Sequence, residues 1–78
     1  MPRLREDFGL RLKAIRQHRK LTQEEFAERL GISVDFLSLI ERGRNAPSFE
    51  TIEQIAERLE VSVASLFTFT RRNRETAR

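Results

Sequence analysis

The sequence contains no cysteine, so neither a disulfide bond nor a thiolate metal site can stabilise its fold. Its single histidine, His18, has no second histidine with which to form a metal site and is expected on the surface. No apolar run approaches the roughly 18 residues that a membrane span requires, and no signal peptide precedes the first charged residues. These absences predict a cytoplasmic protein with no metal, no other cofactor and no membrane partner.

The sequence also lacks the residue patterns on which enzyme catalysis depends. No nucleophile is paired with a base in a recognisable arrangement, and no glycine-rich loop is available to hold a phosphate group. All three glycines lie within or beside the helices predicted below. We therefore expect no enzyme activity.

What is present is sufficient for one small domain. The 78 residues limit the chain to a single core. Hydrophobic residues make up 38% of the chain and charged residues 35%, a balance typical of globular rather than disordered proteins. A core of this size contributes only about 3–5 kcal/mol of net stability, so efficient helix packing or a partner subunit is needed as well.

Charge is unevenly distributed along the chain, although the net charge is only +3. Residues 1–20 carry seven basic and two acidic side chains, whereas residues 21–41 carry one basic and five acidic ones. Residues 61–78 are again basic, with four arginines and one glutamate. Basic ends around an acidic middle favour a polyanionic partner such as nucleic acid. The alternative is that the terminal charges are merely solvated.

The apolar spacing predicts helices and no strand. Phe8, Leu12 and Ile15 recur at the i, i+4, i+7 interval of one helix face. This first helix is expected over residues 2–20 or residues 7–20, depending on which of two plausible starts is used.

The clearest amphipathic pattern predicts a fourth helix that begins after Ser48. Its apolar face is expected to contain Phe49, Ile52, Ile55, Ala56 and Leu59.

Capping residues mark the starts of the other helices. Thr22 and Glu25 form a capping box at the start of a second helix, which Gly31 ends. Serine precedes each later helix, and these helices are expected over residues 33–42, 49–59 and 62–69. Only Gly31 and Ile32 separate the second helix from the third, an interval that matches a helix-turn-helix unit.

These segments resemble the XRE family of helix-turn-helix DNA-binding proteins, which includes phage Cro proteins, phage repressors and restriction–modification controller proteins. The likeness extends over residues 8–67 and is strongest in the runs LTQEEFA from Leu21 and FLSLIERG from Phe36. It implies an all-α, lambda-repressor-like bundle of five helices over residues 1–70. A basic tail over residues 71–78 would follow.

The resemblance implies a sequence-specific, double-stranded DNA-binding transcriptional regulator encoded by a bacterium or a phage. The third helix would lie in the major groove, with Leu37 and Ile40 holding it to the core. The residues expected to read bases are Ser33, Val34, Asp35, Ser38 and Leu39.

Three of these positions leave alternatives open. Val34 and Leu39 can contact thymine methyl groups, or one of them can pack against a neighbouring helix. Asp35 can accept a hydrogen bond from cytosine, or can simply favour the helix dipole without touching DNA.

Other residues are expected to bind the DNA backbone. Gln23, at the start of the second helix, is similar to a family glutamine that contacts phosphate, although an ordinary polar residue could stand there too. The remaining expected phosphate contacts are Arg19, Lys20, Arg42, Arg44 and Asn45. Cations at the end of the third helix can alternatively complement the helix dipole alone.

Two further features follow from the family pattern. Arg16 and Glu41 correspond to its internal ion pair between the first and third helices, so both are expected to be structural. Lys20 and Glu60 stand where the family usually has glycine, which implies a little strain at two helix ends.

The last apolar segment predicts a homodimer. Val63, Leu66, Phe67 and Phe69 crowd a helix too short to bury them all, so some are expected in a dimer interface. The alternative is that they cover the end of the fourth helix. A dimer would place two recognition helices about 34 Å apart on a pseudo-palindromic operator and could contact or occlude RNA polymerase.

Two other functions remain open. The acidic residues Glu24, Glu25, Glu28 and Asp35 are compatible with a protein-interaction or antitoxin-like module on the same fold. Non-specific binding to nucleoid DNA predicts a steep salt dependence without sequence preference.

Overall fold

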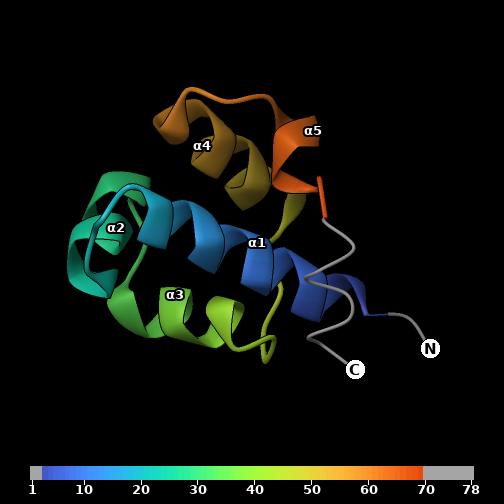
Figure 1. Cartoon of the computed structure of the whole chain (residues 1–78), viewed down its shortest axis with the longest axis horizontal. Coiled ribbons are helices and arrows are strands. Elements are labelled where there is room, and N and C mark those ends of the chain that lie inside the picture. The colour runs from blue at the N-terminus through green and yellow to red at the C-terminus, as the bar shows by residue number, and fades with distance from the viewer. Residues whose placement is uncertain (1–2, 70–78) are drawn as a thin grey trace.

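The computed structural model describes residues 3–69, and the tail predicted over residues 71–78 lies outside this range. The described part is all-helical, as predicted, with α1 (Leu4–His18), α2 (Gln23–Leu30), α3 (Val34–Glu41), α4 (Phe49–Leu59) and α5 (Val63–Leu66). Figure 1 shows α1 crossing the middle of the molecule, with α4 and α5 on one side of it and α3 on the other. α2 lies at the end of the molecule farthest from the N-terminus.

Side-chain hydroxyl groups start four of the five helices. At α2, the Glu25 amide donates to Thr22 Oγ1 at 3.1 Å and the Thr22 amide donates to Glu25 Oε1 at 2.9 Å, which completes the predicted capping box. Ser33, Ser48 and Ser62 cap α3, α4 and α5 in the same way, each through the amide three residues later. These four predicted helix starts are confirmed. The sequence could predict them because each cap depends only on neighbouring residues.

The first helix begins between its two predicted starts. Arg3 occupies the cap position of α1 but makes no capping hydrogen bond with its side chain, so the sequence carries no sharp signal there. The helix then starts at Leu4 and ends at His18.

Two helix ends carry the predicted strain. Lys20 after α1 has a φ of 59° and Glu60 after α4 has a φ of 58°, both in the left-handed region. A side chain with a Cβ atom is disfavoured in this region, and glycine is not. At both positions a residue with a Cβ atom therefore holds a backbone conformation that favours glycine.

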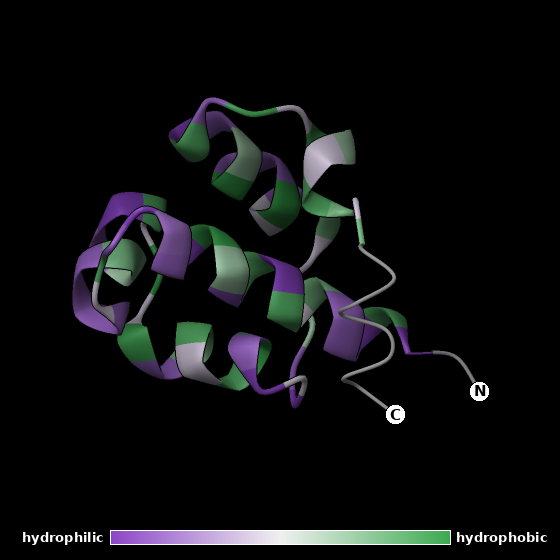
Figure 2. Cartoon of the chain, in the orientation of Figure 1, coloured by the Kyte–Doolittle hydropathy of each residue, from purple (hydrophilic) through white to green (hydrophobic). Residues whose placement is uncertain are grey.

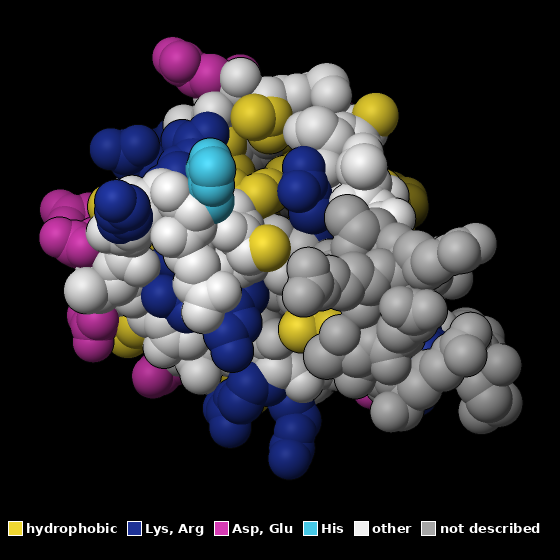
Figure 3. Space-filling view, in the orientation of Figure 1, with side chains coloured by type: hydrophobic (Ala, Val, Ile, Leu, Met, Phe, Trp, Pro, Cys, Tyr) yellow, Lys and Arg dark blue, Asp and Glu magenta, His cyan; other side chains and the backbone are white. Residues whose placement is uncertain are grey.

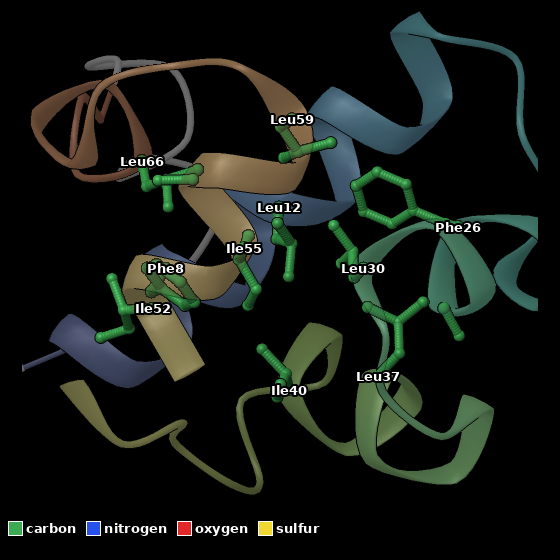
Figure 4. Close-up of a cluster of buried hydrophobic side chains, with 12 residues drawn as sticks. Phe8, Leu12, Phe26, Leu30, Leu37, Ile40, Ile52, Ile55, Leu59 and Leu66 are labelled. Atoms are coloured by element: carbon green, nitrogen blue, oxygen red, sulfur yellow. The ribbon is translucent and has the colours of Figure 1, made fainter. Parts of the chain in front are cut away.

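Each helix contributes to one hydrophobic core. Leu12, Phe26, Leu37, Ile55 and Leu66, one from each helix in order, are fully buried. Figure 4 shows these side chains converging between the helices, and Figure 2 shows hydrophobic and hydrophilic residues alternating along the helices. Burial of this shared core is what holds the short helices α2, α3 and α5 in place.

The backbones of α1 and α3 approach closely at Gly9. Gly9 is buried, and a Cβ atom built there would collide with the backbone carbonyl oxygen of Ile40. Only the absence of a side chain lets the two backbones come this near. The position of α3 against the core is therefore set partly by this glycine.

The structure corrects two expectations about apolar residues. Leu66 is fully buried, so it completes the core and the prediction that it lies in a dimer interface is wrong. Phe49, predicted on the buried face of α4, is 83% exposed, because the first turn of that helix extends past the edge of the core.

The other aromatic residues of the last segment pack on one another. The rings of Phe8 and Phe67 lie 5.1 Å apart between centroids, and those of Phe67 and Phe69 lie 6.2 Å apart. Both Phe67 and Phe69 are half-buried against the core, while Val63 is 42% exposed.

Candidate nucleic-acid interface

The helix-turn-helix unit is formed by α2, a short turn and α3. α2 ends at Leu30 and α3 begins at Val34, with Gly31 in the left-handed conformation (φ 76°) between them. Leu37 and Ile40 are fully buried and fix one face of α3 to the core. The opposite face of α3 is therefore the one available to a ligand.

The five predicted base-reading residues occupy this available face to different extents. Ser33 and Asp35 are exposed, whereas Val34, Ser38 and Leu39 are half-buried. Val34 packs partly against the core, so only part of its side chain remains available. The Ser33 hydroxyl accepts a hydrogen bond from the Phe36 amide at 3.0 Å, which leaves its own proton free to be donated.

Behind α3 lies a buried polar network centred on Glu41, a residue that is only 6% exposed. Arg16 donates from Nε to Glu41 Oε2 at 2.8 Å and from Nη2 to Glu41 Oε1 at 3.1 Å, a two-pronged ion pair between α1 and α3. Arg16 Nη1 also donates to the Leu21 carbonyl oxygen at 3.0 Å. The pair therefore fixes α3 and the α1–α2 loop relative to α1.

Gln23 joins the same network, a link that the sequence reasoning missed. Its Nε2 donates to Glu41 Oε1 at 3.0 Å, which connects the first turn of α2 to the last turn of α3. An amide nitrogen has two protons, so one remains available to a phosphate after this bond forms. No sequence spacing could have revealed a contact between residues 18 positions apart.

The basic residues at the end of α3 are exposed in the loop that follows it. Arg42 and Arg44 lie at the surface, as does the neutral Asn45 beside them. Arg42 Nε makes a long hydrogen bond of 3.4 Å to the Ser38 carbonyl oxygen, the helix-end contact that the alternative interpretation expected. Figure 3 shows basic side chains gathered at the edge of the molecule where α3 and this loop lie, and acidic side chains over α2.

The two basic residues after α1 are placed differently from one another. Arg19 Nη2 donates to the Leu59 carbonyl oxygen at the end of α4 at 3.1 Å. In Figure 1, α4 and α3 lie on opposite sides of α1, so this contact draws the Arg19 guanidinium away from α3. Arg19 therefore does not join Arg42 and Arg44 beside α3. Lys20, which is exposed as Arg19 is, lies at the loop before α2.

Among residues 3–69, no helix is both long enough and apolar enough to cross a membrane. The same residues contain no group of three histidine, aspartate or glutamate side chains arranged to hold a metal ion. His18 is exposed at the end of α1.

Comparison with known proteins shows which family the chain resembles. A model of the helix-turn-helix family HTH_3 matches residues 12–66. The immunity repressor protein of Bacillus phage phi105 is 45% identical over 58 residues, which cover 74% of this chain and 40% of the repressor. The chain therefore spans less than half the length of that relative. The uncharacterized HTH-type transcriptional regulator YazB of Bacillus subtilis strain 168 is 44% identical over 61 residues, covering 78% of this chain and 88% of YazB.

Two solved structures have the same fold. The restriction–modification controller protein C.AhdI from Aeromonas hydrophila superposes with a TM-score of 0.74 at 31% identity, covering 80% of this chain and 94% of C.AhdI. The clp gene regulator ClgR from C. glutamicum superposes with a TM-score of 0.76 at 36% identity, covering 85% of each chain. These matches confirm the family resemblance predicted from the sequence.

Proposed function

This chain belongs to the helix-turn-helix family of DNA-binding regulators, and from that premise we propose that it is a homodimer that reads a pseudo-palindromic operator. One observation carries the proposal. α3 is fixed by Leu37 and Ile40, both fully buried, and presents its other face directly after the short turn that begins at Gly31. A helix held in this way can enter a major groove without rearranging the core.

In the proposed complex, α3 reads base edges with its first two turns. Asp35 and Ser38 can hydrogen-bond to bases, with Asp35 accepting from cytosine N4. The exposed parts of Val34 and Leu39 can contact thymine methyl groups. Ser33 can donate its free hydroxyl proton to a base or a phosphate, since its oxygen already caps the helix.

Phosphate contacts would fix the register of α3 on the duplex. The free amides at the start of α2, together with the second amide proton of Gln23, form one anchor. Arg42, Arg44 and Asn45 form a second anchor at the far end of α3, and Lys20 adds a charge near the first. Arg19 is left out because its guanidinium bonds to α4.

Two copies on one operator would then place their recognition helices about 34 Å apart, in successive major grooves. Such a complex can repress transcription by occluding RNA polymerase or activate it by touching the enzyme from an adjacent site. The presence of a phage immunity repressor among the relatives is compatible with the first of these actions.

Selection of the purified protein on a random DNA library, at near-physiological salt, tests the proposal. Enrichment of a two-fold symmetric motif is the expected result, and the spacing of its halves reports the dimer geometry. If DNA is retained but no motif is enriched, the protein binds DNA without sequence preference and the proposed operator recognition is wrong. If no DNA is retained even at low salt, the proposal fails, and the exposed acidic residues of α2 would point to a protein partner instead.

A further inference from the structure

The most exposed large apolar side chain in residues 3–69 is Phe49, at the start of α4. It is 83% exposed and stands beside a mainly apolar groove of about 310 Å³. Leu4 and Phe8 of α1, Pro47 before α4, Ile52 of α4 and Phe67 after α5 line this groove. An aromatic ring left in water beside an unfilled apolar groove is a typical feature of a contact surface.

The groove has room for a phenylalanine side chain from a second molecule. A cavity of about 150 Å³ is enough to hold a benzene ring, so a groove of about 310 Å³ has room for a phenylalanine side chain. Phe49 forms part of the rim of the groove in its own chain yet remains 83% exposed, so it does not fill that groove. A two-fold axis beside the groove would let each copy insert its Phe49 into the groove of the other.

We propose that the occupant of this groove is a second copy of the same chain, with Phe49 of each copy inserted beside Phe8 and Phe67 of the other. The inference rests on the proposed function, because it names the surface through which the operator-bound dimer forms. It also moves the interface away from the outer face of α5. There Leu66 is fully buried, and Val63, 42% exposed, is the one large apolar side chain of that helix at the surface.

The place of the groove suits a dimer that binds DNA. Its wall includes Asn45, Ala46 and Pro47, from the loop that carries the proposed phosphate contacts after α3. In Figure 1 the segments that build the groove gather at the end of the molecule away from α2. Two copies that meet at this end have their centres separated by roughly one molecular length, 31 Å, comparable to the half-site spacing of about 34 Å.

The size of the patch indicates a weak dimer. Nine residues line the groove, fewer than the roughly 20–30 residues that each side of a standard stable interface contributes. We therefore expect dissociation in dilute solution and association on DNA, where two half-sites hold the copies together.

Sedimentation equilibrium of the full chain tests the interface without DNA. Phe49→Ala should weaken dimerisation about tenfold or more, since truncation of a central aromatic residue typically has an effect of this size. Val63→Ala removes a comparable exposed apolar group outside the groove and should change the dimer dissociation constant less than about twofold. Circular dichroism of both variants should match the wild type, because neither side chain is buried.

Binding to a DNA with one half-site and to a DNA with two separates this inference from the proposed function. Phe49→Ala should bind one half-site as the wild type does but lose cooperativity on two. Wild-type dimerisation without any DNA binding would refute the proposed function and leave the interface standing. Equal dimerisation of Phe49→Ala and wild type would overturn the interface, as would a larger loss in Val63→Ala. A wild type that stays monomeric and binds two half-sites without cooperativity would overturn it too.

Discussion

Glu41 accepts hydrogen bonds from both Arg16 and Gln23 while lying almost completely buried. Its carboxylate thus joins residues from α1, α2 and α3 at one point. A buried charge with several partners adds little net stability when all are present. Removing one partner lowers the free energy of unfolding strongly, because the charge stays buried without it. The role of Arg16 is therefore structural, although it belongs to the most basic part of the sequence.

Replacing Arg16 with alanine should lower the free energy of unfolding by about 3–5 kcal/mol, because Glu41 would stay buried without its cation. Because a core of this size contributes only about 3–5 kcal/mol in total, urea denaturation at neutral pH should find the variant largely unfolded before any urea is added. Arg29→Ala, at an exposed position of α2, is the matched control and should stay within about 0.5 kcal/mol of the wild type. A loss below about 1 kcal/mol in Arg16→Ala would mean that the Glu41 carboxylate finds other partners or water.

At the scale of whole helices, the packing of α1 against α3 decides where α3 stands. Gly9 lets the α1 backbone approach the Ile40 carbonyl group of α3. Helix propensity alone would disfavour glycine in the middle of α1 by about 1 kcal/mol relative to alanine. Its presence there indicates that close packing of the two helices outweighs the cost to α1 itself.

We expect Gly9→Ala to destabilise the protein by about 1–3 kcal/mol, the reverse of what helix propensity predicts. The added methyl group would meet backbone atoms of Ile40 and Glu41, which cannot move aside as a flexible side chain can. Thermal unfolding compares it with Gln17→Ala, at an exposed position of the same helix, which should be neutral or slightly stabilising. An increase in melting temperature for Gly9→Ala would show that α3 can shift to make room.

A helix boundary could be predicted from the sequence where the residues that set it are close together in the chain. The starts of α2, α3, α4 and α5 depend on a hydroxyl and an amide three residues apart, so the sequence contains the whole signal. The start of α1 has no such cap and could only be bracketed.

Burial was harder to predict because it depends on the packing of distant segments. Phe49 follows the helical period of α4 but lies beyond the core, and Leu66 is buried by α5 packing against α1 and α4. Of the interface, the sequence predicted the exposed loop residues and the turn. It missed the bond from Gln23 to Glu41 and the turning of Arg19 toward α4, because both join residues far apart in the chain.

At the scale of the whole molecule, charge is uneven over the surface. On the face that Figure 3 draws, acidic side chains lie over α2 and basic side chains lie beside α3 and its following loop, with further basic side chains elsewhere on that face. A surface divided in this way lets phosphate be bound at chosen points and repelled elsewhere. The salt dependence of DNA binding should therefore reflect a small number of residues rather than the overall charge of +3.

The double variant Arg42→Ala, Arg44→Ala should weaken binding to all DNA sequences alike, because each arginine would no longer neutralise a phosphate. The slope of log K against log salt should become shallower by about 1.8, or about 0.9 for each of the two phosphates. Fluorescence anisotropy over a salt series measures this slope. Arg29→Ala, Arg58→Ala removes two exposed arginines from α2 and α4 and should leave the slope unchanged. An unchanged slope in the Arg42→Ala, Arg44→Ala variant would show that these two arginines do not contact phosphate.

The hydroxyl caps that begin four of the helices also have a consequence for folding rate. Each boundary is specified by residues a few positions apart, and small helical bundles with such local interactions fold in microseconds to milliseconds. A newly synthesised copy is therefore folded almost as soon as it is released. If the chain regulates transcription as the weak dimer proposed above, the delay before regulation begins would be set by the accumulation of a second copy and not by folding.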